Sequence, residues 1–200
     1  MTNPTPRLDP AQNRGLRELY AGARQLASHW TTLADRLGDG DGPVALRAGA
    51  AAARELLDEL AGLTAARGLH GSPAAQGVGA RVAGLRNAVT DRTFERNQAL
   101  RFAVLDMGHL TTLQAYLAVL AGGREDEELA EWHGRWERKL KRLETAVRKA
   151  AIAEGHYPDS AIAPLDDGTL GRAGHGVANA AGTLGEWFDR SLAERRGGGG

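Results

Sequence analysis

Cysteine is absent from this chain of 200 residues. The absence excludes disulfide bonds, thiolate metal sites and cysteine nucleophiles. No uncharged apolar run reaches the roughly 18 residues that a membrane-spanning helix needs. The first ten residues, MTNPTPRLDP, lack a basic stretch followed by an apolar one. We therefore expect no signal peptide and no membrane span, and the composition fits a cytoplasmic protein.

Net charge is absent as well, because 25 Lys and Arg residues balance 25 Asp and Glu residues. Broad nucleic-acid binding and attachment to acidic membranes both need a basic excess, so we expect neither partner. The glycine-rich stretches at 77–84 and 168–176 do not match a phosphate loop or a dinucleotide fingerprint. There is also no Gly-x-Ser-x-Gly motif. The absence of a catalytic constellation favours a non-enzymatic protein, although it leaves the question of an enzyme open.

Apolar residues instead recur at alternating spacings of three and four, which is typical of helices that bury one face. The first run lies between residue 11 and the glycine-rich turn GDGDGP at 38–43. Its members are Leu16, Leu19, Ala23, Leu26, Trp30, Leu33 and Leu37. A second run, from Leu46 to Leu63, contains Gly49 among small residues, which predicts close approach of a neighbouring helix. A fourth run starts near Glu125 and includes Trp132 or His133, Trp136 and Leu140.

The third and longest helical stretch, roughly 74–120, has an interrupted pattern. Its apolar spacing fails between Val89 and Leu110, which predicts a kink, or a break into two helices, within TDRTFERNQ at 90–98. We expect Leu105, Leu110 and Leu113 to lie in the core. The interruption itself contains Arg92, Arg96, Asn97 and Asp106. These residues predict either an anion pocket or a polar layer that fixes helix register, or else arginines that reach solvent, which we favour.

Four helices joined by short loops predict an all-α fold, an up-down-up-down four-helix bundle. We place a flexible arm at 1–10 and the bundle at 11–155. A Gly/Pro-rich C-terminal extension follows at 156–196 and ends in a short amphipathic helix over 177–192. A flexible GGGG tail closes the chain at 197–200.

Five residues would share one end of such a bundle, given a rise of about 1.5 Å per residue. They are His29, Glu55, Asp106, His109 and His133. Histidine and carboxylate ligands suit zinc, iron or manganese, but the paired Glu-x-x-His motif of di-iron bundles is missing. The metal site is therefore our alternative hypothesis. Our preferred interpretation places these residues on the flanks of the helices, with Asp106 and His109 hydrogen-bonded to neighbours, and needs no cofactor.

Two aromatic-rich segments suggest protein contacts, because tryptophan is a favoured interface anchor. They contain Trp132 and Trp136 in the fourth helix and Leu184, Trp187 and Phe188 in the extension. We therefore predict an interaction or scaffold protein that contacts a protein partner or another copy of itself through these faces. The alternative is a metal-binding or metal-dependent bundle.

Overall fold

The computed structural model describes residues 8–67 and 94–165. Four long helices dominate this part of the chain: α1 (Pro10–Leu37), α2 (Asp41–Ala66), α4 (Arg96–Gly122) and α5 (Glu127–Ala153). A single 3-10 turn, η2 (Glu154–His156), and a short helix, α6 (Pro158–Ala161), follow α5. The only β feature among the described residues is an isolated bridge between Glu95 and Pro164. The predicted all-α bundle is therefore confirmed.

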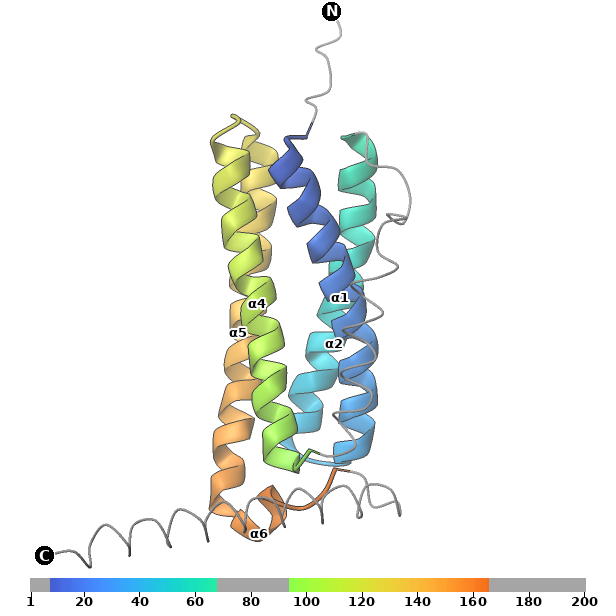
Figure 1. Ribbon diagram of the computed structural model, residues 1–200, viewed down its shortest axis with the longest axis vertical. Coiled ribbons are helices and arrows are strands. Elements are labelled where there is room, and N and C mark those ends of the chain that lie inside the picture. Colours follow the sequence, from blue (N-terminus) through green and yellow to red (C-terminus); the bar gives the residue numbers. More distant parts are fainter. Residues whose placement is uncertain (1–7, 68–93, 166–200) are drawn as a thin grey trace, which may run out of the picture.

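The four helices form a bundle in which α1 and α5 each contact both α2 and α4 (Figure 1). We call the end that holds the start of α1 the upper pole, and the end that holds α6 the lower pole. Helix α1 runs to the lower pole and α2 returns to the upper one. Helix α4 starts at the lower pole, where Arg96 Nη1 donates to the Leu37 carbonyl oxygen at 3.1 Å. Helix α5 starts at the upper pole, where Asp126 meets Arg67 at the end of α2.

Helices α2 and α4 therefore both run toward the upper pole, and the predicted up-down-up-down order is wrong. The order is down, up, up, down. The error came from extending one helix across residues 74–120. Glu95 instead has an extended backbone, with φ −72° and ψ 153°, and α4 begins only at Arg96. The start of α4 thus falls within the predicted interval 90–98, while the earlier part of the predicted helix lies outside the described residues.

Local signals account for most helix boundaries. Asp9 caps α1 by accepting a hydrogen bond from the Ala11 amide at 2.8 Å, and Gln12 completes a capping box. Gly38 and Gly40 adopt positive φ angles of 78° and 124°, which only glycine adopts readily, so the predicted turn after α1 is confirmed. Asp126 caps α5 through the Leu129 amide. Helix α5 thus begins at Glu127, two residues after the predicted start.

The predicted apolar stripes meet in the core. All seven residues of the first stripe are buried, and so are Leu46, Leu56 and Leu60 of the second. Gly49 faces Trp30 so closely that a Cβ atom there would overlap the indole ring, which confirms the predicted close approach. No helix among the described residues is long and apolar enough to cross a membrane.

Candidate docking surface

The outer face of α4 is exposed yet uncharged apart from one histidine. Its most exposed large side chains are Val119 and Leu105, at 75% and 65% of full exposure. We call the following set the α4 face: Phe102, Leu105, His109, Thr112, Ala115, Tyr116 and Val119. Large exposed apolar patches are uncommon on proteins that work alone, and they often mark sites of interaction.

Most of the α4 face forms one straight stripe. Positions 102, 105, 109, 112, 116 and 119 follow the alternating three-four spacing of a helix seam, so their side chains lie in one line. With a rise of about 1.5 Å per residue, the stripe is about 25 Å long. Its inner counterpart, which includes Met107, Leu110 and Leu117, packs in the core. Helix α4 is therefore apolar on two opposite sides, only one of which the bundle covers.

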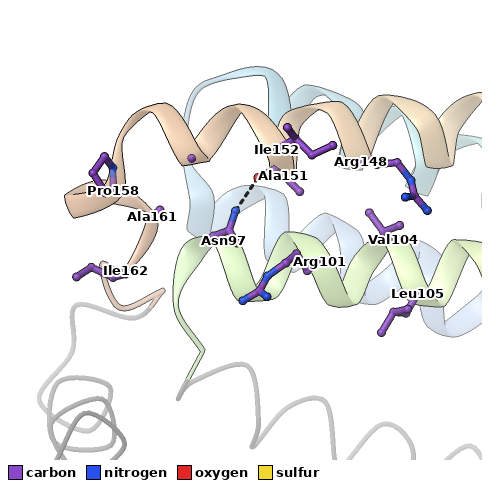
Figure 2. A pocket seen from close by; sticks show the side chains of 11 residues that line it. Asn97, Arg101, Val104, Leu105, Arg148, Ala151, Ile152, Pro158, Ala161 and Ile162 are labelled. Atoms are coloured by element: carbon purple, nitrogen blue, oxygen red, sulfur yellow. Dashed lines mark hydrogen bonds between the residues drawn. The ribbon is translucent and has the colours of Figure 1, made fainter. Parts of the chain in front are cut away.

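A groove of about 640 Å³ continues the α4 face toward the lower pole (Figure 2). Its walls are mostly apolar and include Leu105 from α4 and Ile152 from α5, with Ile162 after α6. Arg101 and Arg148 border it from α4 and α5. The volume lies within the roughly 300–1,000 Å³ that is usual for ligand pockets. The groove thus combines an apolar floor with two cationic side chains.

The chain passes the foot of the α4 face again after α6. The Leu165 amide donates to the Phe94 carbonyl oxygen at 3.0 Å, and the Arg96 amide donates to the Ala163 carbonyl oxygen at 3.1 Å. The Phe94 ring stacks on Phe102, with centroids 4.7 Å apart and planes 3° from parallel. Residues 163–165 are therefore fixed beside the first residue of the α4 face.

The two tryptophans that we predicted as contact residues are buried instead. Trp132 is 5% exposed and Trp136 is 2% exposed. Their Nε1 atoms donate to the same oxygen, Glu59 Oε2, at 2.7 and 2.9 Å. Partial burial raises the pKa of Glu59, but hydrogen bonds from Trp136, Trp132 and Arg135 outweigh it and hold that pKa below its usual value. These indoles therefore lock α5 to α2 and offer no exposed aromatic face.

His133, a predicted metal ligand, lies fully inside the bundle. Its Nδ1 atom is 2.5 Å from Gln114 Oε1, and neither His133 Nε2 nor Gln114 Nε2 has a partner among the described residues. Burial, the largest cause, and the positive charge of Arg67 together lower the pKa of His133 to about 4, although the negative charge of Asp126 partly opposes the shift. The imidazole is therefore neutral near pH 7.

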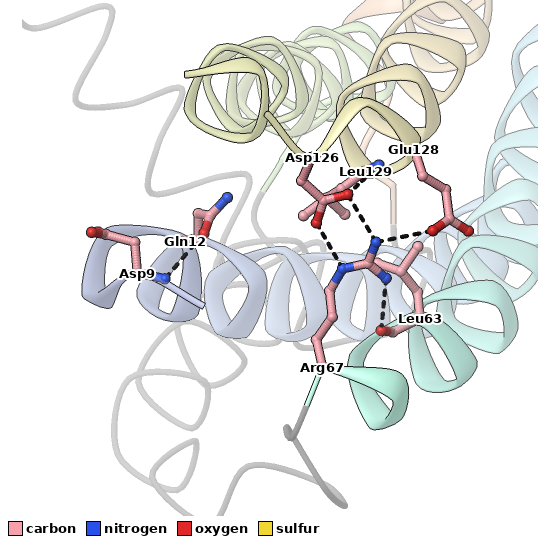
Figure 3. Close-up of polar contacts among 7 residues, drawn as sticks. All are labelled: Asp9, Gln12, Leu63, Arg67, Asp126, Glu128 and Leu129. Carbon is pink, nitrogen blue, oxygen red and sulfur yellow. Dashed lines mark hydrogen bonds and ion pairs between the residues drawn. The ribbon is translucent and has the colours of Figure 1, made fainter. Parts of the chain in front are cut away.

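A charged cluster closes the upper pole (Figure 3). Arg67 donates from Nε and Nη2 to the two carboxylate oxygens of Asp126, both at 3.0 Å, and Nη2 also reaches Glu128 at 3.2 Å. The hydrogen bonds from Arg67 lower the pKa of Asp126, more strongly than burial raises it. The cluster joins the end of α2 to the start of α5.

Of the four remaining predicted metal ligands, the structure brings three together and places Glu55 elsewhere. His29, Asp106 and His109 line one small pocket of about 120 Å³ between α1 and α4. His109 Nε2 lies 3.0 Å from Glu18 Oε1, and Glu55 pairs with Lys139 across α2 and α5. Over residues 8–67 and 94–165, no group of three or more His, Cys, Asp or Glu residues is arranged to hold a metal ion. The pairing of His109 with a neighbour agrees with the flank interpretation.

The polar interruption of the third stretch closes the lower pole. Arg96 reaches the last carbonyl of α1, and Asn97 Nδ2 donates to the Ala151 carbonyl oxygen near the end of α5 at 2.6 Å. Both side chains thus satisfy carbonyl groups that a helix end leaves unpaired. They act as a polar layer that fixes the helix ends, rather than as arginines in solvent. Arg92 lies outside the described residues.

Sequence reasoning missed the α4 face. We placed Leu105 in the core together with Leu110 and Leu113; those two are buried, but Leu105 is exposed. A sequence signal was present, since Asp106 is the only Asp, Glu, Lys or Arg between Arg101 and Arg124. A helix with so few charges has no polar side to turn toward water. The predicted contact residues Leu184, Trp187 and Phe188 lie outside the described residues.

Comparison with protein-family models found no match, and comparisons with curated proteins and with solved structures found none. The functional inference therefore depends on the surfaces of this chain.

Proposed function

We propose that the protein is a non-enzymatic helical interaction protein that binds an amphipathic helix of a partner across the α4 face. The observation that carries the proposal is the exposed stripe from Phe102 to Val119, which lacks Asp, Glu, Lys and Arg. Its straight three-four spacing suits the apolar side of another helix, as in helix-in-groove recognition. The cysteine-free composition supports a cytoplasmic setting for this interaction.

The groove at the lower end of the α4 face adds selectivity to this proposal. Its apolar walls suit one or two large side chains at the end of the bound helix. Arg101 and Arg148 at its border suit an acidic residue next to them, because opposite charges favour one register and orientation of the partner. We therefore expect a partner helix with an uncharged face about 25 Å long and acidic residues near one end.

The burial of Trp132 and Trp136 narrows the proposal to this surface. Both indoles already donate to Glu59 inside the bundle. The exposed aromatic side chains of the proposed contact surface are instead Phe102 and Tyr116 on α4. A metal-dependent function has no comparable support, since the five predicted ligands are divided among three places. We do not propose it further.

Photo-crosslinking in extracts of the cells that produce the protein tests this function. Because the chain has no cysteine, Ala115→Cys on the α4 face carries a benzophenone maleimide at one position only. Thr145→Cys on the exposed side of α5 is the matched control. We expect the Ala115 probe to crosslink to peptides that form an amphipathic helix, and we expect Val119→Glu to abolish these crosslinks.

Two results would overturn the proposal. One is equal crosslinking from the Ala115 and Thr145 positions, which would mean that the α4 face is not special. The other is crosslinking that persists unchanged in the Val119→Glu variant, because a charge buried within an apolar contact should weaken it strongly.

A further inference from the structure

We propose that residues 177–192 of the same chain form the helix that covers the α4 face in the absence of another partner. The inference rests on the proposed function, because it identifies one helix that this surface accepts. It treats the C-terminal segment as a partner in cis, which an external helix would have to displace.

The point at which the described chain ends supports this assignment. Leu165 is hydrogen-bonded to Phe94, and Phe94 stacks on Phe102 at the foot of the α4 face. The 35 residues from 166 to 200 therefore start next to the surface that lacks a cover. Ile162, which is 54% exposed and lines the groove, lies three residues before this exit.

The sequence of 177–192 matches the α4 face in pattern and length. As a helix it would place its apolar side chains on one side, with a length of about 23 Å against about 25 Å for the stripe. These side chains are Val177, Ala181, Leu184, Trp187, Phe188 and Leu192. The pairing would supply Trp187 and Phe188, which are large aromatic anchors, to the exposed apolar side chains of the α4 face.

The linker between the two parts permits docking within one chain. Residues 166–176 number 11 and include four glycines, and 11 residues span up to about 36 Å when extended. This reach allows the helix to run in either direction along α4. A short tether also gives an effective concentration on the order of millimolar, which favours the chain's own segment over that of a second copy.

Charge complementarity supports the same arrangement. Asp166 and Asp167 follow Leu165 directly. Arg101 and Arg148 border the groove that continues the α4 face toward the lower pole. Opposite charges at the start of the linker therefore favour a path along the groove and onto the α4 face.

Tryptophan fluorescence of the purified full-length chain tests the proposal. Trp30, Trp132 and Trp136 are buried in the bundle, and Trp187 is the fourth and last tryptophan. The signal of Trp187 is obtained by subtracting the fluorescence of a Trp187→Phe variant. Quenching by acrylamide then reports whether Trp187 is shielded from water.

We expect Trp187 to be shielded in the native chain and quenched several-fold more strongly in the Val119→Glu variant. Leu105→Glu is a second variant on the same stripe and should have the same effect. Val44→Glu is the matched control, since Val44 is also highly exposed but lies at the start of α2. All three sites are exposed, so the bundle should fold in each variant, and the circular dichroism of the helices confirms this before quenching is measured.

Three outcomes would overturn the inference. The first is full quenching of Trp187 in the native chain. The second is a Trp187 that stays shielded in both α4 variants, which would place the segment on another surface. The third is shielding that depends on protein concentration and accompanies a dimer in light scattering, which would mean that a second copy covers the α4 face. None of these outcomes affects the crosslinking test of the proposed function, so the two hypotheses fail separately.

Discussion

The outer faces of α4 and α5 differ sharply, although the two helices lie side by side and have the same length of 27 residues. The exposed positions of α5 are mainly charged, with an acidic start from Glu127 and a basic second half. The exposed positions of α4 above Arg101 carry no Asp, Glu, Lys or Arg. A charged face is hydrated and needs no partner, whereas an apolar face gains stability when it is covered. This contrast is why we propose the outer side of α4, rather than that of α5, as the surface that contacts a partner.

Replacing an aromatic residue on each helix should give the largest contrast. Trp136→Ala on α5 should lower the free energy of unfolding by about 3–5 kcal/mol, because it removes a buried indole and leaves a cavity. Tyr116→Ala on the α4 face should cost less than about 1 kcal/mol, since surface substitutions have small effects. Urea unfolding followed by circular dichroism measures both values. Similar losses in the two variants would show that the α4 face is part of the core.

The next effect concerns pH and the buried imidazole of α5. The pKa of His133 is about 4 in the folded protein, against about 6.5 in an unfolded chain. The unfolded state therefore binds a proton first as the pH falls, so stability is full above pH 6.5 and declines toward pH 4, by about 3 kcal/mol in total. Urea midpoints measured across this range test the decline. The His133→Gln variant should lose most of this pH dependence, and an unchanged slope would contradict the assignment.

The upper-pole ion pair should have an intermediate effect. Arg67→Met should destabilise the bundle by about 2 kcal/mol, because it leaves the partly buried carboxylate of Asp126 without its cation. Thermal unfolding is the measurement. Arg148→Met is the matched control, since its pair with Glu144 is formed by a side chain that is 60% exposed, and it should change little. Equal losses in the two variants would mean that the cluster does not join α2 to α5 as described.

The smallest effect should come from the only histidine of the α4 face. His109→Ala removes an exposed pair with Glu18 and should lower the free energy of unfolding by about 0.5 kcal/mol or less. Elemental analysis of the purified protein and of this variant gives a second measurement. Stoichiometric metal in the native protein that is absent from the His109→Ala variant would support the metal-site hypothesis.

The fold was largely predictable because it depends on periodicity. A helix such as the one from Leu16 to Leu37 has a single apolar face, and the structure buries that face. The order of the helices was not predictable in the same way. The sequence around Glu95 contains no glycine or proline, and its break is stabilised by distant contacts with Ala163 and Pro164. Spacing along one helix cannot show such contacts.

The candidate site was harder to predict, and for a different reason. Spacing places Leu105 and Leu110 equally well in a core, because each belongs to a regular apolar stripe. Which stripe is buried depends on the position of α1 and α5 around α4. For Trp132 and Trp136, the decisive factor was one carboxylate, Glu59, on another helix. The scarcity of charge along α4 was the one feature that sequence alone offered.

The down, up, up, down order of the helices has a consequence for assembly. The most extensive contacts join α1 with α2 and α4 with α5, so the bundle consists of two antiparallel hairpins. Residues 68–93 form their only covalent link, and this link must return over about 40 Å, the length of a 27-residue helix. In thermodynamic terms the two hairpins behave like the two subunits of a heterodimer, and the covalent link sets their effective concentration. Cutting it would turn folding into a bimolecular reaction, whose stability depends on protein concentration.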